Sequence, residues 1–330
     1  MPVPDGVART AVELYGERGA AWAQRLPALI ATLAERWGFR VLSPLAGLAA
    51  NYVAAVVCAD GTEAVLKVAV PNPEVLTEIE ALRLYAGGGA ARLLQADEAE
   101  GALLVERLQP GTPLADLADD EQTIAIAAEV MRRLWRLLPA AHPFPSVADW
   151  ARGLERLRAR FGGGTGPFPA ALVERAESLF AALIASAAAP VLLHGDLHHW
   201  NIVRARREPW LAIDPKGLAG EAAYEAGALV RNCLPEPAAP GPTRRLLARR
   251  IDQLADALGC ERERLLGWSL AQAVLSAWWS YEDTGRIWGQ ALTVAECLSR
   301  LARRGRHGCL RAGRRREHPD QGRRRDHPRR

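Results

Sequence analysis

The 330-residue chain lacks three features that would mark it as an exported, membrane or disulfide-stabilised protein. Its five cysteines are scattered and form no CxxC pair, which argues against a disulfide framework or a zinc knuckle and favours a reducing compartment. It has no apolar run long enough to span a bilayer. Residues 1–10 show no basic segment followed by an apolar one. We therefore expect a cytoplasmic protein with no membrane span.

Lysine is nearly absent: of the 42 basic residues 40 are arginine, and the two lysines are Lys67 and Lys216. A sequence that uses arginine wherever a positive charge suffices is expected to keep lysine where a compact ammonium group is needed. Both lysines are therefore candidate site residues, although drift in base composition alone would also produce such a bias.

The net charge of +4 comes from the C-terminal segment. Residues 303–330 contain 12 arginines and three acidic residues, which leaves 30 basic and 35 acidic residues, about −5, in the rest of the chain. This segment has almost no apolar residues, so we expect a disordered tail. Such a tail can contact nucleic-acid phosphates, but an accidental extension of the reading frame explains it at least as well. The charge of the remaining residues favours cationic partners.

Hydrophobic spacing divides the chain into a β-rich part and a helical part. In the first, helices are expected at 6–38 and 74–85 and strands at 52–58, 64–68, 91–95 and 102–108. In the second, helices are expected at about 120–138, 149–161, 170–187 and 265–281, with short strands at 191–193, 202–203 and 210–213. We therefore expect a two-lobed α+β fold, with an N-terminal lobe at 1–108 and a C-terminal lobe at 109–302.

The segment from His194 to Asn201 contains the pattern His-x-Asp-x4-Asn, and Asp214 follows a short apolar strand. This spacing is typical of the catalytic loop and the metal-binding aspartate of kinases. Asp196 is suited to accept the proton of an attacking hydroxyl. Asn201 and Asp214 offer oxygen ligands to a Mg²⁺ ion that bridges nucleotide phosphates.

Two other interpretations of this segment are open. One is a polar turn capped by its aspartate and asparagine. The other is a metal site built from His194, Asp196, His198 and His199, which needs a further ligand. His142 and three histidines of the tail are the candidates for that ligand.

Lys67 lies on an expected strand, and Glu78 lies eleven residues further on in the next expected helix. In kinases such a lysine–glutamate pair holds the α- and β-phosphates of the nucleotide. Glu80 competes for the role but points about 200° away around the helix, so one of the two faces outward. The alternative is a lysine on an edge strand and a glutamate on a helix surface that do not form a site together.

Residues 103–114 lead from an apolar strand into Pro110 and Gly111, as expected for a hinge between two lobes. Backbone groups around Glu106 and Leu108 are suited to pair with an adenine edge. The sequence contains no GxGxxG motif; Gly47 and Asn51 precede the first strand of the hairpin, but no residue is assigned to a phosphate-binding loop.

Together these segments resemble the aminoglycoside phosphotransferases, small-molecule kinases with a protein-kinase-like fold. The resemblance is strongest to the streptomycin 6-phosphotransferase and hydroxyurea-kinase branch, and it covers about residues 10–302. The segments that carry it are LVERL at 104–108, LLHGDLHH at 192–199, WLAIDPKGLAGE at 210–221, GWSLAQ at 267–272 and WWSYED at 278–283.

This resemblance implies an ATP- and Mg²⁺-dependent phosphotransferase with an alcohol group as acceptor. It implies that Asp196 is the catalytic base, that Asn201 and Asp214 bind magnesium, and that Lys67 and Glu78 position the nucleotide. A catalytically inactive homologue is disfavoured because all five positions are filled. A nucleic-acid-associated protein that binds through residues 303–330 is the alternative from another class.

Streptomycin carries two guanidinium groups and an amine, so an acidic pocket should bind it, whereas hydroxyurea is small and neutral. Glu221, Glu282 and Asp283 are candidates for the acidic lining, and Glu225 is expected to be a solvated surface carboxylate. Lys216 either neutralises the transferred phosphate or forms an ion pair with Glu221. Streptomycin is the expected acceptor, with hydroxyurea or another small metabolite as the alternative.

Overall fold

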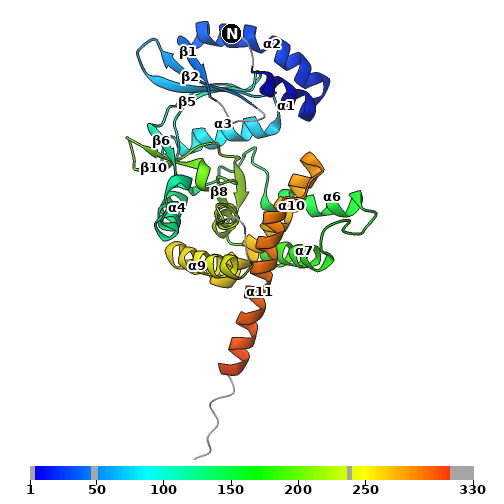
Figure 1. Ribbon diagram of the computed structural model, residues 1–330. Helices are drawn as coiled ribbons and strands as arrows, with labels where there is room; N and C mark the ends of the chain where they lie inside the picture. The colour runs from blue at the N-terminus through cyan, green and yellow to red at the C-terminus, as the bar shows by residue number, and fades with distance from the viewer. Residues whose placement is uncertain (1–3, 46–50, 236–239, 313–330) are drawn as a thin grey trace, which may run out of the picture.

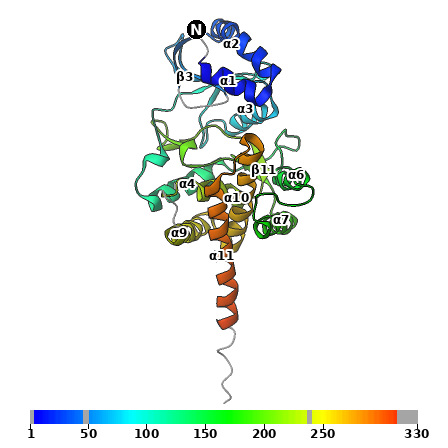
Figure 2. The same ribbon diagram turned by 45° about the vertical axis from the view of Figure 1, so that its right-hand side comes forward.

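The computed structural model describes residues 4–45, 51–235 and 240–312. A lobe built on a β-sheet lies at one end and a lobe of helices at the other, and helix α11 extends away from the second lobe (Figures 1 and 2). None of the helices in the described part combines the length and the apolar character that crossing a membrane requires.

The N-terminal lobe begins with two helices where the sequence predicted a single one. Helices α1 (Asp5–Tyr15) and α2 (Glu17–Trp37) are separated at Gly16, whose φ of 57° is readily adopted by glycine. The buried face of α2 includes Trp22, Leu26 and Leu33, and it packs in one apolar cluster with the sheet. The predicted apolar face therefore covers the sheet, although the helix is interrupted.

The sheet of this lobe is antiparallel, with strand order β1-β2-β3-β5-β4. Its strands are β1 (Phe39–Pro44), β2 (Tyr52–Cys58), β3 (Glu63–Val68), β4 (Leu93–Asp97) and β5 (Ala102–Glu106). The β2–β3 hairpin agrees with the predicted one, and Tyr52 is opposite Val68 in its register. Helix α3 (Pro73–Tyr85) follows β3 and is capped by the Asn72 side chain, which accepts two backbone N–H groups.

The chain enters the second lobe directly after β5. Strand β6 (Pro110–Pro113) pairs with β9 (Ile202–Ala205), which in turn pairs with β10 (Trp210–Ala212). A further small sheet joins β7 (Arg136–Leu137), β8 (Val191–Leu193) and β11 (Leu218–Gly220). The expected lobe boundary, between residues 108 and 109, lies between strands that belong to two different sheets.

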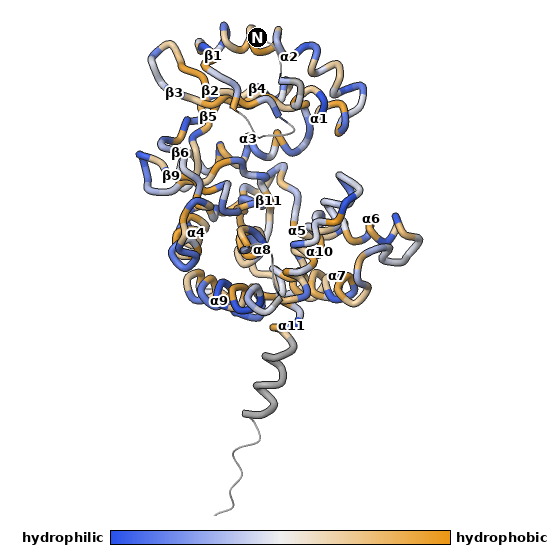
Figure 3. The backbone as a smooth tube through the Cα atoms, viewed as in Figure 1, coloured by the Kyte–Doolittle hydropathy of each residue, from blue (hydrophilic) through white to orange (hydrophobic). Residues whose placement is uncertain are grey.

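The helices of the second lobe surround α10 (Arg262–Thr284), which is buried along most of its length. The others are α4 (Asp120–Leu134), α5 (Val147–Ala151), α6 (Gly153–Arg160), α7 (Ala170–Ala185), α8 (Ala226–Arg231), α9 (Pro240–Leu258) and α11 (Gly289–Ala312), with short 3₁₀ turns at Leu114–Asp116, His199–Asn201 and Ala222–Glu225. Apolar and polar stretches alternate along these helices (Figure 3), and the buried residues of α10 include Leu265, Leu270 and Leu275.

Helix α11 corrects one expectation from the sequence. The segment predicted to be disordered begins at residue 303, but the helix continues to Ala312. Residues 313–330 lie outside the described part. The helix is amphipathic where it meets the lobe, because Ala291, Val294, Ala295 and Leu298 are all buried.

Candidate active site

The loop after β8 carries Asp196 and is fixed by its own neighbours. Nε2 of His194 lies 2.8 Å from the carbonyl oxygen of Ile213, and its Nδ1 accepts the N–H of Asp196 at 3.3 Å. Asn201 donates from Nδ2 to the carbonyl oxygen of Asp196 at 2.9 Å. Burial lowers the pKa of His194 to about 4, so the imidazole is neutral and orients the loop without carrying charge.

Glu225 is buried and binds the backbone of the same loop. Its prediction as a solvated surface carboxylate is therefore wrong. It is 1% exposed and accepts the N–H groups of His194 at 2.6 Å and of Gly195 at 3.0 Å. Burial raises the pKa of Glu225 to about 7, while the two amide hydrogen bonds oppose that rise. Its role is to position the backbone that precedes Asp196.

The carboxylate of Asp196 faces two side chains from the second lobe. Arg231 of α8 places Nη2 3.5 Å from one oxygen, and His198 places Nε2 3.6 Å from the other. Arg231 is 5% exposed and also donates to Gln272. Burial lowers the pKa of His198, which favours its neutral form. Arg231 was not among the predicted site residues, although an arginine at the end of the apolar segment 226–230 was a signal of a buried charge.

Lys67 joins the two lobes. Its Nζ lies 2.9 and 2.8 Å from the two carboxylate oxygens of Glu78, and it also forms an ion pair with Asp214. Burial alone would lower the pKa of Lys67, but Glu78 and Asp214 raise it above its ordinary value. Glu80 points elsewhere and pairs with Arg83. The structure therefore brings together the lysine and the two carboxylates that the sequence singled out.

Asp214 and Asn201 form an oxygen donor set that suits a hard divalent cation. Burial opposes ionisation of Asp214, but Lys67 lowers its pKa to about 2, so the carboxylate is charged. Because Asn201 uses its Nδ2 on the loop backbone, its amide oxygen is the atom left for a ligand. The residues present therefore fit a Mg²⁺ ion.

The alternative histidine metal site finds no support in the described part of the chain. No group of three or more His, Cys, Asp or Glu residues there is arranged to hold a metal ion. His142 instead stacks on Phe144, with ring centroids 5.5 Å apart. His194 is committed to the backbone of the catalytic loop.

Glu106, in the segment expected to bind adenine, is already engaged in hydrogen bonds within the protein. The N–H of Glu106 donates to the carbonyl oxygen of Arg92 at 2.8 Å, and its carboxylate accepts from Arg207 at 3.1 and 3.0 Å. Glu106 thus ties the end of β5 to the β9–β10 turn, and its amide is not available to a ligand. Leu108 lies beyond the end of β5 and lines a shallow surface pocket.

A small cavity of about 90 Å³ adjoins the Lys67 ion pairs, and Asn51 is among its lining residues. Gly47, which the sequence analysis considered for the phosphate-binding loop, lies outside the described residues. Lys216 lines this small cavity as well as a larger one next to Asp196. It pairs with Glu74 of α3 at 3.0 Å and not with Glu221, so the predicted Lys216–Glu221 pair is wrong.

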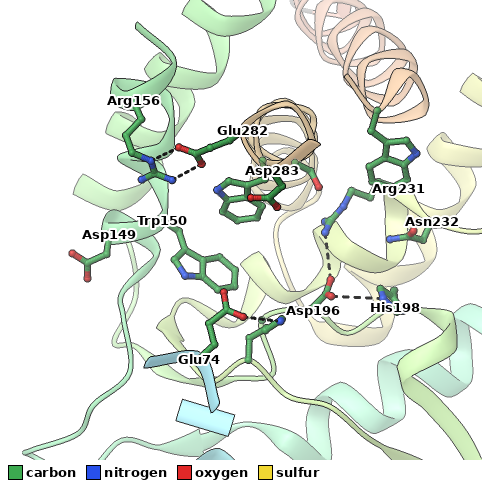
Figure 4. Close-up of a pocket in the computed structure, with 15 residues that line it drawn as sticks. Glu74, Asp149, Trp150, Arg156, Asp196, His198, Arg231, Asn232, Glu282 and Asp283 are labelled. Carbon is green, nitrogen blue, oxygen red and sulfur yellow. Dashed lines mark hydrogen bonds and ion pairs between the residues drawn. The ribbon is translucent and has the colours of Figure 1, made fainter. Parts of the chain in front are cut away.

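The large cavity has a volume of about 650 Å³ and opens beside Asp196 (Figure 4). Glu282 and Asp283 line it, as the sequence analysis expected of acceptor-binding residues. The full lining is Glu74, Asp149, Trp150, Arg156, Gly195, Asp196, His198, Lys216, Arg231, Asn232, Ser276, Trp279, Glu282, Asp283 and Trp288. Five carboxylates thus face three cationic side chains, which makes the lining acidic.

Glu221 lies outside this lining, which corrects its prediction as a substrate-binding residue. It is 9% exposed, forms an ion pair with Arg264 through both of its oxygens, and accepts from Nε1 of Trp268 at 3.3 Å. Its carboxylate therefore joins the segment after β11 to α10.

Comparison with known proteins places this site in a family. The family model described as aminoglycoside/hydroxyurea antibiotic resistance kinase matches residues 40–284. The chain is 33% identical over 300 residues to a streptomycin 6-kinase of Streptomyces griseus, covering 90% of this chain and 97% of the relative. It is 35% identical over 290 residues to a hydroxyurea phosphotransferase of Kitasatospora aureofaciens, covering 86% and 81% of the two chains.

Solved structures agree on the fold. A choline kinase from Streptococcus pneumoniae superposes with a TM-score of 0.61 at 13% identity, covering 84% of this chain and 99% of that one. An aminoglycoside phosphotransferase mutant in complex with ADP and hygromycin B gives 0.58 at 17% identity, covering 83% and 98%. The two-lobed, kinase-like fold expected from the sequence is confirmed. The chain belongs to the aminoglycoside/hydroxyurea antibiotic resistance kinase family and is a phosphotransferase that acts on a hydroxyl group.

Proposed function

We propose that the protein transfers the γ-phosphate of ATP to the 6-hydroxyl of streptomycin and so inactivates the antibiotic, in the cytoplasm. The observation that carries the proposal is the position of Asp196 at an acidic cavity of about 650 Å³, large enough for a cationic saccharide. The similarity to streptomycin 6-kinases over most of the chain supports the same acceptor. Association with nucleic acid stays a prediction confined to residues 303–330.

Each polar group of the site has a part in this reaction. Asp196 accepts the hydrogen bond of the acceptor hydroxyl and takes its proton as the new P–O bond forms. Arg231 and His198 hold the carboxylate toward the cavity. Lys67, held by Glu78, binds the α- and β-phosphates, and Leu108 offers its backbone to the adenine.

Asp214 and Asn201 would hold magnesium together with the nucleotide phosphates. When bound, Mg²⁺–ATP supplies the phosphoryl group and neutralises charge on its oxygens. Lys216 lines both the large cavity and the small cavity beside Asp214. Its ammonium therefore lies where the transferred phosphate passes between donor and acceptor, and it contributes positive charge there.

The test is ATP consumption by the purified protein with Mg²⁺ in the presence of streptomycin, other aminoglycosides or hydroxyurea. We expect turnover that depends on streptomycin and that falls by at least roughly 10³-fold in Asp196→Ala, with ATP affinity retained. Normal turnover by Asp196→Ala would refute the assignment of the base.

Hydroxyurea is the second candidate acceptor, because a hydroxyurea phosphotransferase matches the chain at 35% identity. Turnover with hydroxyurea alone would keep the phosphotransfer chemistry and replace the acceptor. Absence of turnover with every compound of the panel would reject both acceptors.

A further inference from the structure

Two tryptophans of the large cavity lie directly beside the catalytic loop. The rings of Trp150, on α5, and Trp279, on α10, have centroids 5.2 Å apart with their planes at 89°. Trp150 also covers Gly195: a Cβ atom there would lie 3.0 Å from Cη2 of the ring. A large aromatic surface therefore begins one residue before Asp196 and continues to α10.

The carboxylates of the cavity differ in whether a cation already neutralises them. Glu74 is paired with Lys216, Glu282 with Arg156 and Asp149 with Arg152. Asp196 faces Arg231. Asp283, in contrast, makes no hydrogen bond or ion pair with any residue that the structure describes. It is the carboxylate of this lining that is left for a cation from outside.

Asp283 and the tryptophans share one side of the cavity. Asp283 follows Trp279 by four residues, so both lie on the same face of α10. Figure 4 shows Asp283 projecting into the cavity on the side where Trp150 lies. Burial and the negative charges of Glu282 and Glu74 raise the pKa of Asp283, while Arg156 and Lys216 oppose that rise.

We propose that Asp283, Trp279 and Trp150 form a corner that binds a planar guanidinium group of the acceptor. A guanidinium group can donate two parallel hydrogen bonds to one carboxylate while its flat face stacks on an aromatic ring. The inference rests on the proposed phosphotransfer to streptomycin and names the group by which that acceptor is recognised. Hydroxyurea has no charge to place in this corner, so the corner discriminates against it.

The experiment compares steady-state kinetics of four proteins at saturating Mg²⁺–ATP: the wild type, Asp283→Asn, Trp279→Leu and Glu263→Gln. Glu263 is an exposed carboxylate in the first turn of α10, paired with Arg262, and it serves as the control for loss of one charge on the same helix. Asp283→Asn is expected to raise the KM for streptomycin by roughly 10- to 100-fold with little change in kcat or in the KM for ATP. Trp279→Leu raises the same KM, and Glu263→Gln changes nothing.

A small probe tests the guanidinium group itself. Methylguanidinium should inhibit the wild type competitively against streptomycin and should lose that effect in Asp283→Asn, whereas urea at equal concentration should not inhibit either protein. Thermal unfolding of each variant verifies that it folds.

Three results would overturn the inference. They are an unchanged streptomycin KM in Asp283→Asn, equal inhibition of wild type and variant by methylguanidinium, and turnover with hydroxyurea but not streptomycin. The first two results leave phosphorylation of streptomycin by the wild type intact and so differ from failure of the proposed function. In the third the wild type does not phosphorylate streptomycin, so the proposed acceptor fails together with this inference.

Discussion

Replacement of Glu221 by alanine should destabilise the protein and leave acceptor binding unchanged. The sequence placed this residue in the substrate pocket, whereas the structure buries it between Arg264 and Trp268 of α10. The substitution leaves the guanidinium of Arg264 without its carboxylate and the indole N–H of Trp268 without an acceptor.

The size of the effect follows from the burial of the pair. Removing one partner of a buried ion pair costs about 3–5 kcal/mol. Because the side chains of Glu221 and Arg264 are 9% and 18% exposed, some solvation remains and the lower limit is appropriate. A loss of about 3 kcal/mol corresponds to a roughly 100-fold shift of the unfolding equilibrium.

Urea unfolding followed by tryptophan fluorescence measures this loss, and the exposed Glu263→Gln substitution, expected to change stability by less than about 0.5 kcal/mol, is the control. The KM for streptomycin should stay at its wild-type value in both variants. A raised KM for streptomycin in Glu221→Ala with unaltered stability would refute this reasoning. It would show that the carboxylate contacts the acceptor and that its ion pair with Arg264 does not stabilise the fold.

Two further predictions concern the ion pairs of Lys67. Lys67→Met should reduce kcat/KM for ATP by roughly 10²-fold or more. Glu78→Gln should reduce it by a smaller factor, because the ammonium group of Lys67 remains. Equal effects of the two substitutions in steady-state kinetics would contradict the idea that Glu78 acts by positioning the lysine. Asp214 has a pKa of about 2 in the folded protein, below its value in the unfolded chain, so the stability it contributes is present above about pH 4 and is lost as the pH falls toward 2. Urea unfolding in metal-free buffer at several pH values should show a weaker acid dependence in Asp214→Asn, and an identical dependence would refute the ion pair.

The parts of the site that could be predicted from the sequence are those whose chemistry is local. Asp196 and Asn201 lie in one short loop, so their spacing alone identified them. Lys67 and Glu78 are separated by one connection between a strand and a helix. Helical periodicity showed that only one of Glu78 and Glu80 can face the lysine, and the structure shows that it is Glu78.

The parts that could not be predicted depend on contacts between distant helices. A glutamate has the same appearance in sequence whether it meets solvent, a buried arginine or buried backbone N–H groups, which is why Glu221 and Glu225 were assigned to the wrong environments. Arg231 and Trp150 reach the catalytic loop only through the packing of α8 and α5. The continuation of α11 beyond residue 302 was not predicted because the high arginine content there indicated disorder, although arginine has a good helix propensity.

Helix α3 pairs with both lysines of the chain: Glu78 binds Lys67 and, one turn earlier, Glu74 binds Lys216. Every ε-amino group of the protein therefore lies at the junction of the two lobes. An amine-selective acylating reagent, which modifies many surface positions of an ordinary enzyme, here has two side-chain targets. Lys216, with 40% of its side chain exposed, is open to the reagent, while Lys67, at 13%, is shielded. In this protein a general lysine reagent becomes a probe of the junction between the two lobes.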